Sequence, residues 1–294
     1  MLKSQPPKRL YKYRAFNVNT LRLLSEAEVY YADPASFNDP LDSKPTILPD
    51  TDRETLEKLL YQMLVKSVNK EYALKNIKNH RYMSSQYGDY KTDNETEKYY
   101  KQLLASNVKG LLYEELGKRG VLSLAKRWDC PLMWSHYADE HRGLCIEYDM
   151  TTYVWHGLHP VDYRLPRSIK ISELYDWKMK GSTSAEKAIK NIFYLAKAPQ
   201  WRYEREWREI GNSIGSSSAP ARVSAIHFGL RCDSSVITAI VKLHTSLNPP
   251  VKFYAIHPQD DSFSLKRRLI DTDEIEATGI RSSPLLDFSD VFID

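Results

Sequence analysis

The sequence predicts an α+β protein: a single domain with a split, mainly antiparallel sheet and a helical insertion. Three observations lead to this fold class. Six or more short strand-like segments are interspersed irregularly with helical ones, unlike a regular βαβ array. Residues 51–119 carry apolar side chains at helical spacing. There is no internal repeat and no glycine-rich phosphate loop, so the sequence does not support a Rossmann or P-loop fold.

Composition and charge narrow the class of protein. The 294 residues include 42% hydrophobic and 27% charged side chains, an ordinary globular balance. The net charge of +4 is too small to indicate nucleic-acid binding by itself. Three cysteines without a CxxC pair argue against a disulfide framework and a zinc site. No signal peptide or long apolar run is present, so we expect a cytoplasmic protein without a membrane partner.

The N-terminal part predicts a flexible tail followed by a strand-rich start. Residues 1–9 are rich in proline and lysine, which is typical of a loose tail, and the domain is expected over residues 10–294. The first elements are expected to be a strand over 10–16, a short helix over 17–24 with an asparagine N-cap, a strand over 28–32 and a turn cluster over 33–42.

The segment 51–119 is predicted to be a helical insertion in two amphipathic pieces, with a polar stretch of little periodicity between them. Two interpretations stay open. The insertion is either a lid or partner-binding cap over a site, or a packing element that completes the core.

Residues after the insertion return to mixed structure. The pattern predicts strands over 121–125, 143–148, 201–210, 223–230 and 251–256, short helices over 131–137, 184–193 and 234–243, a flexible loop over 211–220, and a polar C-terminal segment.

The first candidate site residues lie on the first strand and in the turn cluster. Alternation places Lys12 and Arg14 on one face, and an arginine offers a planar fork for phosphate. Taken alone, this strand is typical of an amphipathic edge strand. Asn38 and Asp39 precede Pro40 and predict Asx-turns that hold the loop rigid, either as structure or as the lining of a pocket.

Aromatic residues and histidines gather between residues 123 and 149. Trp134, Tyr137 and His141 have the spacing of one helical face, with His136 between them. Such a face stacks a flat ring or fills a core, and the sequence leaves both interpretations open.

Two glutamates stand near the end of the most aromatic segment. Strand alternation puts Glu204, Glu206 and Arg208 on one face, so the two carboxylates should couple. One of them would then have a raised pKa and serve as acid or base. The alternative is a surface ladder of glutamates paired to arginines on a neighbouring strand.

Four sequence stretches together resemble the mainly bacterial domain-of-unknown-function family numbered 2971. They read LYKYRAF, YYADPASFNDPLD, VLSLAKRWDCPLMWSHYADEHRGLCIEYD and KAPQWRYEREWREI, and they lie within residues 10–42 and 120–210, with weaker likeness through about residue 257. The insertion is not covered, and the family name implies no activity.

The same motif order also resembles the Arg–Ser–Glu class of ADP-ribosyltransferases. The resemblance implies NAD as substrate, a role in a toxin or defence system, and a protein or nucleic acid as acceptor. Arg14, aided by Lys12, would bind NAD, Ser123 would orient the central strand, and Trp134 or Tyr137 would stack on nicotinamide. Glu206 would stabilise the transition state, with Glu204 facing the acceptor. Ala125 departs from the second serine of the class motif.

Two other function classes stay open. One is a non-catalytic nucleotide- or nucleic-acid-binding module that uses Lys12, Arg14 and the aromatic residues. The other is a phosphodiesterase or nuclease that binds a magnesium or manganese ion through a set of carboxylates. That set would consist of Asp39, Asp42, Glu204 and Glu206.

Overall fold

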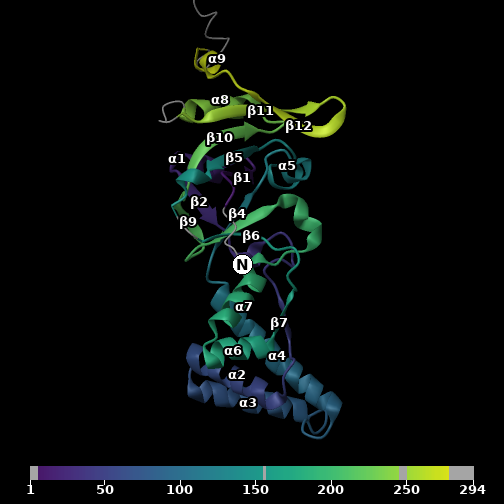
Figure 1. Ribbon diagram of the computed structural model, residues 1–294. Helices are drawn as coiled ribbons and strands as arrows, with labels where there is room; N and C mark the ends of the chain where they lie inside the picture. Colours follow the sequence, from purple (N-terminus) through teal and green to yellow (C-terminus); the bar gives the residue numbers. More distant parts are fainter. Residues whose placement is uncertain (1–5, 155–156, 245–249, 278–294) are drawn as a thin grey trace, which may run out of the picture. The chain divides into compact units, whose positions relative to one another are not determined.

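The computed structural model describes residues 6–154, 157–244 and 250–277 (Figure 1). Contacts group these residues into two compact units. Unit 1 holds residues 30–123 and 157–217, and unit 2 holds residues 6–29, 124–154, 218–244 and 250–277. Helices and mainly antiparallel strand pairs make up both units, so the predicted α+β class is confirmed.

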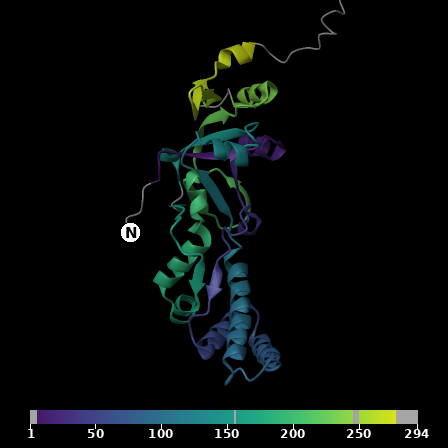
Figure 2. The same ribbon diagram turned by 90° about the vertical axis from the view of Figure 1, so that its right-hand side faces the viewer.

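The helices of unit 1 share one apolar core. They are α2 (Arg53–Ser67), α3 (Lys70–Ser85), α4 (Asn94–Leu116), α6 (Ile171–Lys180) and α7 (Thr183–Leu195). Figure 2 shows the long α4 beside α2 and α3. The buried side chains of α2 have the spacing predicted from the sequence. They are Leu56, Leu59, Leu60, Met63 and Leu64.

Residues 51–119 are mainly helical, as predicted, and their packing favours a core role. Side chains of α2, α3 and α4 belong to the same hydrophobic cluster as those of α6 and α7. The stretch expected to lack periodicity starts within α3, which continues to Ser85 and buries His80 and Ser84. The segment is therefore part of the core of unit 1.

Short strands complete unit 1. They are β3 (Thr46–Leu48), parallel to β7 (Ser168–Lys170), and β6 (Leu158–Pro160), antiparallel to β8 (Glu206–Ile210). The other neighbour of β8 is β4 (Val121–Ala125), whose first three residues belong to unit 1. A 3-10 helix, η1 (Pro34–Ser36), precedes β3, and β2 (Glu28–Tyr31) pairs with β9 (Gly215–Ser218).

Unit 2 is built on a sheet in the order β12-β11-β10-β5-β1, with the end of β4 beside β1. Its strands are β1 (Arg9–Arg14), β5 (Leu144–Asp149), β10 (Arg222–Phe228), β11 (Lys252–Gln259) and β12 (Ser262–Leu269). Its helices are α1 (Val18–Ser25), α5 (Pro131–Tyr137), α8 (Ser234–His244), α9 (Thr272–Ala277) and the 3-10 turn η2 (Met150–Thr152). All neighbouring pairs are antiparallel except β10 with β11.

Several predicted elements are corrected. The first strand is not an edge strand, because β1 lies between β5 and β4. The strand predicted over 201–210 begins only at Glu206, since Pro199–Glu204 forms a 3-10 helix, η3. Its alternation of large and charged residues imitates a strand, but Pro199 at the first position favours a helical turn. The loop over 211–220 contains β9, and the polar C-terminal segment contains β12 and α9.

In the described part of the chain, no helix combines the length and the apolar character that crossing a bilayer requires.

Candidate functional site

A sharp turn at Arg205 places two glutamates in the interior of unit 1. The chain leaves α7, passes Lys197, and forms η3. Arg205 then adopts a left-handed backbone with φ of 46° and ends η3 directly before β8. Glu204 precedes this turn and Glu206 follows it, and both side chains are buried. The turn thus brings the two carboxylates together by a route that strand alternation does not describe.

Lys197 joins three carboxylates. Its Nζ donates hydrogen bonds to Glu204 and, at 2.9 Å, to Oε2 of Glu206, and it lies 3.5 Å from Oδ2 of Asp42. Its ammonium also lies 5.2 Å from the centre of the Trp201 ring. A single cation therefore links residues of η3, β8 and the loop before β3.

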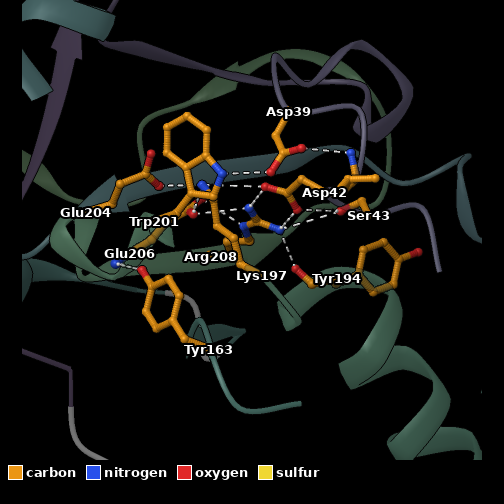
Figure 3. A network of polar contacts seen from close by, with 11 residues as sticks. Asp39, Asp42, Ser43, Tyr163, Tyr194, Lys197, Trp201, Glu204, Glu206 and Arg208 are labelled. Atoms are coloured by element: carbon orange, nitrogen blue, oxygen red, sulfur yellow. Dashed lines mark hydrogen bonds and ion pairs between the residues drawn. The ribbon is translucent and has the colours of Figure 1, made fainter. Parts of the chain in front are cut away.

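Arg208 forms the second link (Figure 3). Its guanidinium donates from Nη1 and Nη2 to the two carboxylate oxygens of Asp42, at 2.9 and 2.6 Å. Nε donates to Oε1 of Glu206 at 2.8 Å, and Nη1 also donates to the carbonyl oxygen of Tyr194 at 2.7 Å. This is the bidentate geometry in which arginine binds carboxylates most strongly.

The loop that carries Asp42 is held by turns that the sequence predicted. Asp39 accepts a hydrogen bond from the backbone N–H of Leu41 at 2.8 Å, which is an Asx-turn. The other oxygen of Asp39 accepts from Nε1 of Trp201 at 2.7 Å. Asn38 is exposed beside it. Asp39 therefore fixes the loop against η3.

We call Asp42, Lys197, Glu204, Glu206 and Arg208 the carboxylate network. None of the five is more than 9% exposed, and Arg208 is 1% exposed. The network thus gathers three carboxylates and two cations in the interior of unit 1. The alternative of a surface ladder is therefore wrong for this segment. A charge that is buried this deeply destabilises the fold unless its ion-pair partners are present.

Glu206 is the glutamate of the pair that stays charged. Burial by itself raises the pKa of Glu206, but the charges of Arg208 and Lys197 and hydrogen bonds from Arg208 and Ser123 outweigh it. The net effect lowers the pKa below its ordinary value, so Glu206 is ionised at neutral pH. Ser123 and Glu206, which the sequence proposed for one site, are thus in contact.

This pKa shift predicts a loss of stability in acid. A carboxyl whose pKa is lower in the folded than in the unfolded chain stabilises the fold above its unfolded pKa of about 4.3. That contribution is lost as the pH falls from there through the folded pKa of Glu206. Urea unfolding of the full chain between pH 7 and pH 3 should show a falling free energy of unfolding below about pH 5. A constant value would contradict the assignment.

A pocket of about 230 Å³ borders the network. Ser43 and Lys197 form part of its wall, and Lys44 and Arg167 contribute two further cations. The rest of the lining is apolar, and no acidic side chain is among the lining residues. The pocket therefore combines a positive lining with a wall residue, Lys197, whose ammonium is bound to buried carboxylates.

The network does not have the character of a divalent metal site. Within the described ranges, no group of three or more histidine, cysteine, aspartate or glutamate side chains is arranged to hold a metal ion. The oxygens of Asp42 and Glu206 accept hydrogen bonds from Arg208, so a guanidinium occupies the position between them. The residues thus do not fit the magnesium or manganese hypothesis.

The remaining predicted site residues belong to unit 2. Lys12 and Arg14 are half-buried on β1, on the face opposite the buried tyrosines, as alternation predicted. His136 is exposed and Tyr137 half-buried at the end of α5. Trp134 is fully buried, donates from Nε1 to the carbonyl of Trp128 at 2.7 Å, and packs edge-on against Tyr13. Roles in NAD binding for these residues stay predictions.

Lys197 is the member of the carboxylate network that the sequence analysis missed. It stands in the KAPQW motif, but nothing in the spacing connects a lysine at the end of a helix with two glutamates beyond a proline. Lys44 and Arg167 were also missed, because they meet only through the pairing of β3 with β7.

Comparison with known proteins gives one match. Residues 133–209 match the model of the family described as "Protein of unknown function (DUF2971)". The match covers about a quarter of the chain and includes Lys197, Glu204, Glu206 and Arg208. No curated protein and no solved structure matches the chain. The likeness to this family therefore supports the resemblance stated from the motifs, and it carries no activity.

Proposed function

We propose that unit 1 binds NAD and breaks its nicotinamide–ribose bond, either to transfer ADP-ribose to an acceptor or to hydrolyse NAD. One observation carries this proposal. Lys197 lines the pocket and at the same time contacts three buried carboxylates. The pocket thus has cations on its lining and three carboxylates directly behind one wall.

This charge distribution suits both ends of NAD. The pyrophosphate carries negative charge, for which Lys44 and Arg167 are suitable partners. The nicotinamide end is positively charged. When its C–N bond breaks, the electron pair leaves with nicotinamide and positive charge develops on the ribose. A fixed negative charge near that position stabilises the transition state without forming a covalent bond.

The contacts of Glu206 define its part in this proposal. Both of its carboxylate oxygens accept hydrogen bonds, from Arg208 and from Lys197. Glu206 is therefore suited to supply fixed charge and is not suited to accept a proton. Binding of the ribose 2′-hydroxyl by Glu206 rests on the resemblance to ADP-ribosyltransferases alone.

The test is nicotinamide release from NAD by the full chain, with cell lysate as acceptor and a chelator present. Lys44→Ala and Arg167→Ala should each raise KM for NAD about tenfold, since a hydrogen bond to a charged group contributes about 1.5 kcal/mol or more. Lys66→Ala, an exposed cation on α2, is the matched control and should leave KM unchanged. Absence of nicotinamide release, together with no thermal shift by NAD, would contradict the proposal.

A second candidate is nucleotide binding without catalysis. The observation that favours it is that both Arg208 and Lys197 form ion pairs with Glu206, so these two cations compensate the charge of its carboxylate. Under this hypothesis NAD or another nucleotide raises the melting temperature, Lys44→Ala and Arg167→Ala abolish that shift, and no nicotinamide is released. The same set of measurements therefore separates the two candidates.

A further inference from the structure

One face of the unit 2 sheet carries arginines and aromatic rings around a buried glutamate. We call Arg9, Trp128, Lys252, Tyr254 and Arg267 the arginine–aromatic face. The register places Arg9 of β1 on the same face as Glu147 of β5, because Tyr11 and Glu147 are paired. Likewise Tyr254 of β11 pairs with His227 of β10, and Lys252 lies two residues before it. The opposite face is covered by α8, whose His244 contacts Phe253.

Glu147 is a buried residue that holds several polar side chains of this face in place. It is 3% exposed and has four polar partners. Oε1 lies 3.3 Å from Nε of Arg9 and accepts from Ser224 at 2.9 Å. Oε2 lies 3.2 Å from Nη1 of Arg267 and 3.3 Å from Nε2 of His227. A buried carboxylate thus fixes two guanidiniums whose side chains remain 58% and 25% exposed.

The charge of the face is positive. Burial would raise the pKa of Glu147, but hydrogen bonds from His227 and Ser224 and the charge of Arg9 lower it to about 2. Burial also lowers the pKa of His227, so this ring is neutral at pH 7. Glu147 therefore faces two arginines, Asp149 on the same face is paired with Arg222, and Lys252 is exposed nearby. The excess charge suits an anionic partner.

Three stacked rings lie next to these charges. Trp128 stacks on His227 with centroids 5.5 Å apart and an angle of 8° between the planes, and Tyr254 stacks on His227 at 5.1 Å and 17°. The guanidinium of Arg267 lies 5.2 Å from the centre of Trp128 and 4.3 Å from that of Tyr254. His227 is fully buried, whereas Trp128 and Tyr254 are half-buried. The two outer rings are thus held from inside and remain partly accessible.

We infer that the arginine–aromatic face binds single-stranded nucleic acid. Unpaired bases would stack on Trp128 and Tyr254, and Arg9, Lys252 and Arg267 would contact the phosphates. Stacking on aromatic side chains combined with a positive surface is the general mode of single-strand recognition. A duplex does not offer its base faces to a flat sheet, so single strands should bind better. This inference does not depend on the proposed function of unit 1.

The test is fluorescence anisotropy of the full chain with labelled oligothymidylate and oligouridylate of about 20 nucleotides, in about 50 mM and about 200 mM salt. Binding should weaken with salt. Trp128→Leu and Arg267→Gln should each lower affinity about tenfold, since one stacked base contributes about 1–3 kcal/mol. Circular dichroism checks that each variant is folded.

Arg268→Gln is the matched control. Arg268 is exposed and follows Arg267 on β12, so its side chain points to the opposite face. Both substitutions remove one positive charge, and Arg268→Gln should change affinity less than about twofold. Equal losses in the two variants, binding that Trp128→Leu leaves unchanged, equal affinity for duplex DNA or heparin, or no binding in low salt would each overturn the inference.

Discussion

Replacing Glu206 by glutamine is expected to lower the free energy of unfolding by about 3–5 kcal/mol, because it breaks the buried ion pairs that Glu206 makes with two cations. Glu206 is 6% exposed and contacts both Lys197 and Arg208. Urea denaturation followed by circular dichroism measures the effect. Glu115→Gln removes one partner of a surface pair with Lys178, where the carboxylate side chain is 48% exposed, and should cost at most about 1 kcal/mol.

A double substitution at Glu206 and Lys197 tests whether the two residues stabilise the fold through their mutual ion pair or independently of each other. Lys197→Met replaces the ammonium by an apolar side chain of similar length, so the variant with both substitutions loses one charge of each sign and keeps the net charge of the network. The loss in the double variant should be at least about 1 kcal/mol smaller than the sum of the two single losses. Additive losses would contradict a coupled network. Because a destabilised Glu206→Gln variant loses activity by unfolding, its folded fraction is measured before its activity is interpreted.

Truncating Trp134 to alanine is expected to cost about 3–5 kcal/mol of unfolding free energy. Its ring is fully buried, lies 5.2 Å from Tyr13 and 6.0 Å from His141, and its Nε1 donates to Trp128. Removing it leaves a cavity and an unpaired carbonyl in unit 2. Thermal unfolding and urea denaturation provide the measurement.

Tyr137→Ala tests the same helix at a half-buried position and should cost about 1 kcal/mol or less. Trp134→Phe should recover part of the loss, since it keeps an aromatic ring in the core. If Trp134→Ala leaves stability unchanged but weakens the binding of NAD, Trp134 is a ligand-stacking residue, as the resemblance implies, and the core interpretation is wrong.

The fold class could be predicted because the spacing of apolar residues along the sequence indicates which side chains of a helix or strand are buried. The spacing of Leu56, Leu59 and Leu60 identifies α2 whatever the helix packs against. The segment 199–204 shows the limit of this reasoning. Alternation of tryptophan, tyrosine and charged residues predicts a strand, yet Pro199 and the left-handed Arg205 produce a 3-10 helix and a turn. Local geometry at single residues overrides the pattern there.

The candidate site could be predicted only in part, for a physical reason. Glu204, Glu206 and Ser123 were identified because their residue types and spacing resemble a known motif. Their partners are chosen by tertiary contact, and Lys197 reaches both glutamates only because the chain reverses at Arg205. The pKa of one of the two glutamates was expected to rise because the coupling of the two carboxylates was considered without these cations. The arginine–aromatic face was missed for the same reason, since Trp128 and Arg267 meet only in the folded unit.

The carboxylate network also bears on the order of events during folding. Lys197 and Glu206 are 9 residues apart in the chain, whereas Arg208 and Asp42 are 166 apart. Closing the longer loop costs about 2.5 kcal/mol more conformational entropy than closing the shorter one. The local contacts around Arg205 are therefore accessible early, while the pairing with Asp42 must wait until the intervening helices have brought their ends together. Asp42 is thus expected to pair late in folding, after the local ion pairs around Arg205 have formed, and to connect them to the rest of unit 1.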